Sequence, residues 1–363
     1  MNQTEALAAI EEPQIGRTLG ELGFLGSVDE NAHTVELLLP VTNWPNRTAL
    51  EGRIAEVFPG ATVVIRTMSE EQRLDLRNRL RAFMAAEPGP GLHEHESSPA
   101  ITDKRSDTRV LGISSGKGGV GKSTVSVNLA IALAQIGKRV GILDADVYGF
   151  SLPKMLGAPS DPIVLGDTVI PTLVHGVRCL SMGYFVDDEQ PVIWRGPMLH
   201  KAIEQLITEA WWDNLDFLLI DMPPGTGDVA LTLSEVIPRI EMYVVTTPQP
   251  AAQRVAQRSA FAAKKLKLAV RGVIENMSYF IGDDGKRYEL FGSGGGAQLS
   301  ADLGIPLLGQ IPLESDVREG GDNGQPTTVA HPESAAAKVF VELATRIASQ
   351  GPSRVYRQEL RLN

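Results

Sequence analysis

Residues 116–124 read Gly-Lys-Gly-Gly-Val-Gly-Lys-Ser-Thr, and this glycine-rich segment is the strongest indication of the fold. It lies between an apolar run at 110–114 and a run of helical character at 124–136. The pattern G-x-x-x-x-G-K-[ST] between a strand and a helix predicts a phosphate-binding loop, because its glycines let successive backbone N–H groups turn toward one anion. The alternative is a glycine-rich turn that binds no ligand. The predicted nucleotide-binding residues of the loop are Gly116, Lys117, Gly118, Gly119, Val120, Gly121, Lys122, Ser123 and Thr124.

Two further apolar runs end in carboxylates. Asp144 and Asp146 follow the run at 139–143, and Asp221 ends the run at 217–221. Ligands of open α/β folds bind at the carboxyl edge of the sheet, where these side chains would meet the loop. Lys122 would offer a cation to the β- and γ-phosphates, whereas Ser123 and Asp221 would be magnesium ligands, Asp221 in the Walker B position. For Asp144, Asp146 and Asp228, helix capping or turn formation is the alternative.

The rest of the second half alternates apolar runs with helical stretches. Runs of this length, apolar on both faces, are typical of a parallel sheet covered by helices. We therefore predict a doubly wound, mostly parallel α/β domain over residues 108–350. The predicted strands are 110–114, 139–143, 217–220, 243–247, 272–274 and 307–311, and the predicted helices are 124–136, 251–266 and 332–349.

The first 87 residues predict a small α+β domain. Strands are expected at 34–39 and 62–66 and helices at 5–11, 50–58 and 69–85. Residues 88–107 are rich in Pro, Gly, Ser and charged residues, which indicates a linker. His93 and His95 lie there, and we interpret them as solvated linker residues in preference to metal ligands. Residues 351–363 form a short basic tail.

Composition excludes several classes of protein. The chain has 363 residues and a formal net charge of −10, so neither nucleic acid nor a membrane is an expected partner. The N-terminus lacks a basic start followed by an apolar stretch, and we expect a cytoplasmic protein. Cys179 is the only cysteine. Intrachain disulfides and multi-cysteine metal sites are therefore excluded.

Lys117, at the second position of the loop, points to one family. G-K-G-G-V-G-K-S-T at 116–124, D-A-D-V-Y-G at 144–149, D-M-P-P-G-T-G-D at 221–228 and E-N-M-S-Y-F at 275–280 resemble the Mrp/ApbC ATPases. This family belongs to the deviant Walker A class, with MinD, ParA and nitrogenase iron protein. W-R-G-P-M at 194–198 and F-G-S-G-G-G at 291–296 also match. The first 85 residues resemble the SufT/PaaD-type domain, more loosely, through L-G-E-L-G at 19–23.

The resemblance implies an ATP-hydrolysing homodimer with two ATP molecules facing each other. Lys117 would reach the partner's nucleotide, Lys122 would serve its own, and Asp146 would position the attacking water. Asp221 would help to hold magnesium. Asn276 would hydrogen-bond adenine, the alternative being an Asn that caps a strand end.

The sequence departs from the family where cluster ligands are expected. Relatives that carry iron-sulfur clusters place C-x-x-C just after M-S-Y-F, whereas residues 281–286 here read Ile-Gly-Asp-Asp-Gly-Lys. Asp283 and Asp284 are candidate iron ligands, but a hairpin turn is the preferred interpretation. Relatives often carry Cys before a Pro in the first domain, where this chain has Trp44-Pro45. We expect Cys179 to be a buried structural thiol.

Two functional hypotheses follow. The first is an ATPase of iron-sulfur cluster assembly or transfer to client proteins, whose cluster ligands come partly from a partner or whose role needs no bound cluster. The second is a nucleotide-dependent dimeric switch of the MinD/ParA kind that recruits or remodels a protein partner. The missing cysteines favour the second, and the overall resemblance favours the first, which we adopt.

Overall fold

The computed structural model describes residues 2–86, 101–103, 105–147, 149–158, 160–185, 196–225 and 227–353. His93 and His95, most of the predicted linker and the tail from residue 354 lie outside these residues. The chain divides into two compact units. The first comprises Met1–Ala100, Pro159–Thr172 and Glu209–Asp213, and the second comprises Ile101–Ala158, Leu173–Thr208 and Asn214–Asn363.

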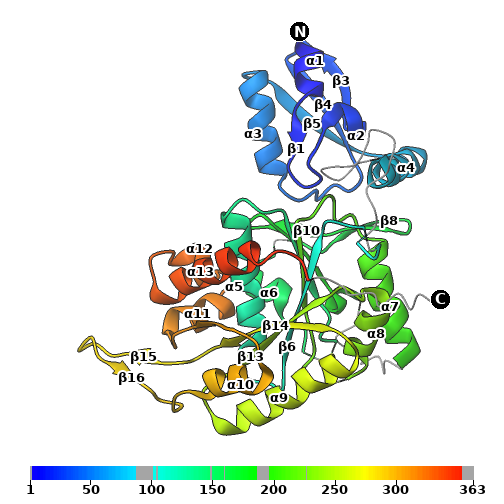
Figure 1. Cartoon of the computed structure of the whole chain (residues 1–363). Helices are drawn as coiled ribbons and strands as arrows, with labels where there is room; N and C mark the ends of the chain where they lie inside the picture. The colour runs from blue at the N-terminus through cyan, green and yellow to red at the C-terminus, as the bar shows by residue number, and fades with distance from the viewer. Residues whose placement is uncertain are drawn as a thin grey trace, which may run out of the picture. The chain divides into compact units, whose positions relative to one another are not determined.

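An eight-stranded sheet forms the centre of the second unit (Figure 1). Its order is β10-β11-β7-β12-β6-β13-β14-β17, and every pair from β11 to β17 is parallel. All residues of β6, β7, β11, β12 and β13 are buried, as a sheet covered on both faces requires. The strands are β6 (Arg109–Ser115), β7 (Val140–Asp144), β10 (Thr172–Val174), β11 (Val177–Ser181), β12 (Phe217–Asp221), β13 (Glu241–Thr246), β14 (Ala269–Glu275) and β17 (Leu307–Gln310).

Helices cover both faces of this sheet, which confirms the doubly wound fold. Helices α5 (Lys122–Gln135) and α13 (Ala335–Ser349) pack on one face, where Tyr243 and Val245 of β13 join their core. Helices α9 (Pro250–Lys265) and α10 (Gly295–Leu303) share a core with Val244, the residue between those two. Because successive side chains of a strand point to opposite faces, this alternation places α9 and α10 on the second face.

Shorter elements complete the second unit. Strands β15 (Phe280–Ile281) and β16 (Arg287–Tyr288) pair in antiparallel fashion, and in Figure 1 their hairpin projects from the sheet. The Asp283-Asp284-Gly285 sequence is therefore the expected hairpin turn, in which Asp284 accepts a hydrogen bond from the Tyr288 hydroxyl at 2.9 Å. The remaining elements are α6 (Leu152–Leu156), the 3-10 helix η1 (Met182–Phe185), α7 (Gly196–Thr208), α8 (Asp228–Val236), α11 (Ser315–Asp322) and α12 (Thr327–Ala330).

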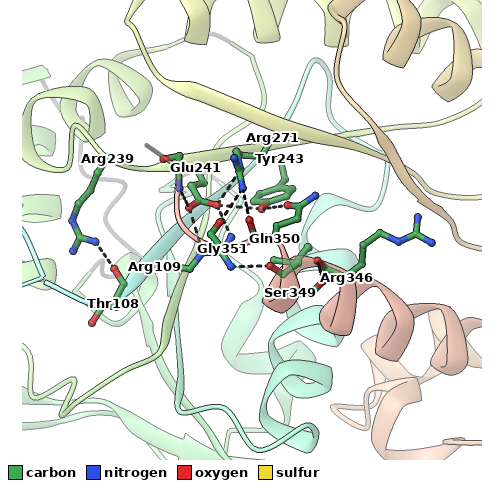
Figure 2. A network of polar contacts seen from close by, with 12 residues as sticks. Thr108, Arg109, Arg239, Glu241, Tyr243, Arg271, Arg346, Ser349, Gln350 and Gly351 are labelled. Carbon is green, nitrogen blue, oxygen red and sulfur yellow. Dashed lines mark hydrogen bonds and ion pairs between the residues drawn. The ribbon is translucent and has the colours of Figure 1, made fainter. Parts of the chain in front are cut away.

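A buried polar network lies near the amino-terminal ends of the strands, and the phosphate loop follows the carboxyl-terminal end of β6 (Figure 2). Arg109, at the start of β6, donates to Glu241 Oε2 at 2.6 Å and to the carbonyl of Ile347 at 2.7 Å. Arg271 of β14 donates to the carbonyl of Gly351 at 2.9 Å. These contacts attach the end of α13 and the residue Gly351 after it to β6 and β14, and Arg109 also links β6, the strand that leads into the loop, to β13.

The first unit is a small α+β fold with the order β3-β4-β5 in its main sheet. The helix expected at 5–11 ends earlier, at Ala8, because Glu11 and Glu12 pair with β2. Its elements are α1 (Gln3–Ala8), β1 (Glu11–Glu12), β2 (Arg17–Thr18), α2 (Leu19–Leu22), β3 (Leu25–Asp29), β4 (Thr34–Leu39), α3 (Arg47–Val57), β5 (Thr62–Thr67), α4 (Glu70–Ala86), β8 (Ile163–Leu165) and β9 (Thr168–Ile170).

The core of the first unit contains side chains from distant parts of the sequence. Ile163, Ile170 and Trp211 belong to the same buried cluster as Phe24 and Trp44. The Trp44 ring meets the Phe24 ring edge-on, with centroids 5.2 Å apart. The residue before Pro45 is thus a large aromatic side chain that packs in the core.

Candidate nucleotide-binding site

The phosphate loop has the backbone that its glycines permit. Gly121 has φ of 76° and is the N-cap of α5. Any other residue there would be strained, and its Cβ would lie 2.2 Å from Asn276 Nδ2. A Cβ at Gly116 would lie 2.2 Å from the backbone nitrogen of Ala256. The loop therefore turns tightly between β6 and α5, with the first turn of the helix directed at the bend.

Asp221 brings together the cation and the hydroxyl that the loop supplies. Its Oδ2 lies 2.5 Å from Lys122 Nζ and 2.7 Å from Ser123 Oγ. Its Oδ1 lies 2.5 Å from Ser126 Oγ. Sequence reasoning placed Lys122, Ser123 and Asp221 at one site but missed Ser126. Ser126 could have been found from its spacing, because it lies three residues after Ser123 and four after Lys122. Residues three and four apart share one face of a helix.

Asp144 organises the segment that carries Asp146. It is 1% exposed, and its carboxylate accepts hydrogen bonds from the backbone N–H groups of Asp146 at 3.1 Å, Ser151 at 2.9 Å and Leu152 at 3.2 Å. Burial, reinforced by the negative charge of Asp221, raises the pKa of Asp144 to about 6. These contacts are those of a turn-forming residue, which was the alternative interpretation of Asp144.

A cavity of about 260 Å³ lies over the loop and gathers the predicted phosphate-binding residues. Lys117 enters it from the loop, and its Nζ is 3.5 Å from Gln249 Oε1. Asp146, from the segment after β7, lines it as well, and its Oδ1 accepts a hydrogen bond from Gly149 N at 3.1 Å. The lining residues are Ser115, Lys117, Gly118, Gly119, Gly121, Lys122, Ser123, Thr124, Asp146, Gly149 and Pro224.

A second cavity, of about 350 Å³, shares Thr124 with the first. Asn276 lines it and donates from Nδ2 to the carbonyl of Val120 in the loop at 2.9 Å. The sequence predicted the strand at 307–311 that precedes part of this wall, but not the wall itself. The other lining residues are Ser151, Lys154, Met155, Met277, Pro312, Leu313, Glu314, Val317, Arg318, Gly321 and Asp322.

Cys179 lies in β11, fully buried, and burial raises the pKa of its thiol. The expectation of a buried structural thiol is confirmed. Among the described residues, no group of three or more His, Cys, Asp and Glu side chains is placed to hold a metal ion. Within the same part of the chain, none of the helices combines the length and hydrophobicity that a membrane span needs.

The sheet order, the loop and the carboxylates define a nucleotide-binding P-loop NTPase with a MinD-like fold. The MinD protein of Pyrococcus horikoshii complexed with Mg-ADP superposes with a TM-score of 0.54 at 28% identity, over 66% of this chain and 96% of that one. A nucleotide-binding protein from Archaeoglobus fulgidus in complex with ADP gives a TM-score of 0.55 at 34% identity, over 64% and 91%.

Residues 107–348 match the ParA family described as NUBPL iron-transfer P-loop NTPase, and the chain belongs to that family. It is 39% identical over 360 residues to the iron-sulfur cluster carrier protein of Mycobacterium leprae, which covers 95% of this chain and 91% of the relative. The protein of the same name from Bacillus subtilis is 41% identical over 313 residues, 84% of this chain and 85% of the relative.

Proposed function

We propose that this protein is a magnesium-dependent ATPase that acts in the assembly of iron-sulfur clusters or in their transfer to client apoproteins. The observation that carries the ATPase part is the contact of Asp221 with both Lys122 and Ser123, below a cavity lined by the phosphate loop. The role in cluster metabolism is supported by two relatives that are named iron-sulfur cluster carrier proteins. Each of them aligns with this chain over most of its length.

The two cavities suit the two ends of a nucleoside triphosphate. Loop N–H groups and Lys122 would bind the phosphates in the smaller cavity, and the nucleoside would occupy the larger one beside Asn276. Asp146, which also lines the smaller cavity, would orient the water that attacks the γ-phosphate. One N–H of Asn276 Nδ2 donates to the carbonyl of Val120, and we assign its acceptor Oδ1 to the amino group of adenine.

The residues present fit a magnesium ion. Ser123 and Asp221 offer hard oxygen donors 2.7 Å apart, and Mg²⁺ usually combines one or two such protein ligands with phosphate and water. When bound, the ion would neutralise charge that develops on the phosphate oxygens. Asp221 also forms an ion pair with Lys122, so both groups are positioned next to the site that we assign to the phosphates and the ion.

A homodimer with Lys117 acting across the interface is part of the proposal. The Lys117 side chain has one hydrogen bond in the described structure, to Gln249 at 3.5 Å. This long contact would leave the amine free to move to a partner's nucleotide. We assign Lys122 to the protomer's own phosphates, because its buried ion pair with Asp221 holds it at the loop.

The ligands for a cluster would have to come largely from a partner. Cluster irons are normally held by thiolates, and the one thiol of this chain is buried in β11. The cluster is therefore cargo that a client or assembly protein would help to hold, or the chain contributes a nucleotide-driven step without binding it.

The test is anaerobic activation of an apo-enzyme that requires a [4Fe–4S] cluster, with an iron and sulfide source, ATP and the full-length protein. We expect ATP-dependent activation by the wild type and loss of that dependence in Lys122→Ala. Lys138→Ala, an exposed lysine beyond α5, is the matched control. Equal activation with and without ATP, or by Lys122→Ala, would argue against the proposal.

A further inference from the structure

Ser126 is a buried hydroxyl in the helix that follows the phosphate loop. It lies in α5 and is 0% exposed. Its neighbours Val125 and Val127 are also buried and belong to the main hydrophobic core of the second unit. A hydroxyl in such surroundings is costly unless it is hydrogen-bonded. Ser126 therefore needs a specific partner, and its contacts identify that partner.

The Ser126 hydroxyl has two acceptors within reach but only one proton to donate. Its Oγ lies 2.5 Å from Asp221 Oδ1 and 3.1 Å from the carbonyl oxygen of Lys122, one helical turn earlier. Hydrogen bonds to carboxylates are shorter and stronger than those to neutral carbonyl groups. We therefore assign the proton to the shorter contact, in which Ser126 donates to Asp221.

This hydrogen bond determines how the Asp221 carboxylate is turned. Ser126 contacts Oδ1, whereas Oδ2 lies 2.5 Å from Lys122 Nζ and 2.7 Å from Ser123 Oγ. Asp221 is 1% exposed at the end of β12, so bulk water does not replace these partners. Because Ser126 holds one oxygen, the other stays beside the two loop residues, both of which line the phosphate cavity.

We propose that Ser126 is a positioning residue for magnesium binding: its hydroxyl holds the Asp221 carboxylate so that Oδ2 remains beside Ser123. This inference rests on the proposed function, in which Ser123 and Asp221 bind the ion. Metal ligands are commonly oriented by hydrogen bonds from residues that do not touch the metal, and loss of such a partner typically weakens metal affinity by about 10- to 100-fold. Ser126 has this relation to Asp221, because it contacts the oxygen that Ser123 does not.

The experiment measures nucleotide binding without turnover over a series of free magnesium concentrations. The full-length protein is titrated with a fluorescent, non-hydrolysable ATP analogue, and the magnesium concentration for half-maximal binding is determined. Ser126→Ala and Ser126→Cys should each raise that concentration about tenfold or more, because both lack a strong donor to Asp221. Alanine is smaller than serine and cysteine is larger, so a common effect would identify the lost donor, and not altered packing, as its cause.

Two comparisons separate a positioning role from a merely structural one. At saturating magnesium, both variants should bind the analogue as tightly as the wild type, whereas a damaged fold would weaken binding at every magnesium concentration. Ser300→Ala is the matched control, because it removes a partly buried hydroxyl of α10 that donates to the carbonyl of Ile305. This control should leave the magnesium requirement unchanged.

The outcomes distinguish this inference from the proposed function. A wild-type magnesium requirement in either Ser126 variant, or weaker binding that saturating magnesium does not restore, would overturn the role of Ser126 and leave the proposed function intact. A wild-type protein that binds no nucleotide, or binds it equally well with and without magnesium, would overturn the proposed function and this inference together.

Discussion

Lys122 Nζ lies 2.5 Å from Asp221 Oδ2, and the two side chains are 7% and 1% exposed. The pair joins the phosphate loop to the strand beside it and is enclosed by protein. A buried ion pair contributes little net stability as a pair, but removal of one partner leaves an uncompensated charge. Binding and stability are therefore linked at this contact.

Lys122→Ala should accordingly lose ATP binding and also lower the free energy of unfolding, by about 3–5 kcal/mol. The double variant Lys122→Ala with Asp221→Asn should recover much of that stability without recovering binding, since it leaves no buried charge unpaired. Denaturant unfolding and ATP titration measure the two effects. Equal stability of Lys122→Ala and the wild type would contradict the buried pair.

The proposed role of Lys117 predicts complementation between inactive chains. A Lys117→Ala protomer retains Asp146, and an Asp146→Ala protomer retains Lys117. If each site takes Lys117 from the partner, a mixed dimer has one complete site, and an equal mixture should show about a quarter of wild-type ATPase activity. Activity no greater than that of the separate variants would place Lys117 in its own site or outside catalysis.

Asp144 predicts a pH-dependent stability with a definite sign. Its pKa is raised from 3.8 to about 6, chiefly by burial, so the folded state binds the proton more tightly than the unfolded chain does. The contribution of Asp144 to the free energy of unfolding should therefore fall by about 3 kcal/mol as the pH rises from about 4 to about 6. Above about pH 6 this contribution should stay constant.

The measurement for Asp144 is the wild-type free energy of unfolding minus that of Asp144→Asn, taken without nucleotide across this range. The subtraction removes other titrating groups, and Glu333→Gln should show no such trend. A difference that rises with pH would contradict the prediction.

Trp211 should be a core residue of the first unit although it lies far outside residues 1–87. Its Nε1 donates to the carbonyl of Ile15 at 3.4 Å, and its ring lies 6.5 Å from that of Phe83, centroid to centroid. Trp211→Ala should destabilise that unit by about 3–5 kcal/mol and accelerate hydrogen exchange in β4. Leu74→Ala, a 47% exposed residue of α4, should have little effect. Unchanged exchange in β4 would contradict this.

The sequence predicted those parts of the site that follow from local pattern. Lys122, Ser123 and Asp221 belong to motifs in which a strand is followed at once by a turn or helix, so their neighbours in space follow from the parallel sheet. Ser126 could not be assigned in that way. Its contact with Asp221 depends on where α5 faces β12, and this is a consequence of tertiary packing.

The domain boundaries, too, could be predicted only in part from the local sequence pattern. A shift in composition marks the end of the first 87 residues, but the hydrophobic pattern of residues 163–170 is equally compatible with either core. Only the three-dimensional contacts group Ile163, Ile170 and Trp211 with Phe24. The boundaries at 87 and 107 remain predictions, since residues 87–100 lie outside the described chain.

The last prediction concerns the cluster: the purified protein, reconstituted alone with iron and sulfide, should not hold a stable stoichiometric [4Fe–4S] cluster. Such a cluster normally takes four thiolates, and a dimer would offer two Cys179 thiols, each fully buried in β11. Cys179→Ser should change only stability, by about 1–3 kcal/mol, because it buries a hydroxyl. Iron counting and absorbance after desalting provide the measurement. About four irons per dimer, lost in Cys179→Ser, would overturn the ligand count and identify the thiol as a ligand.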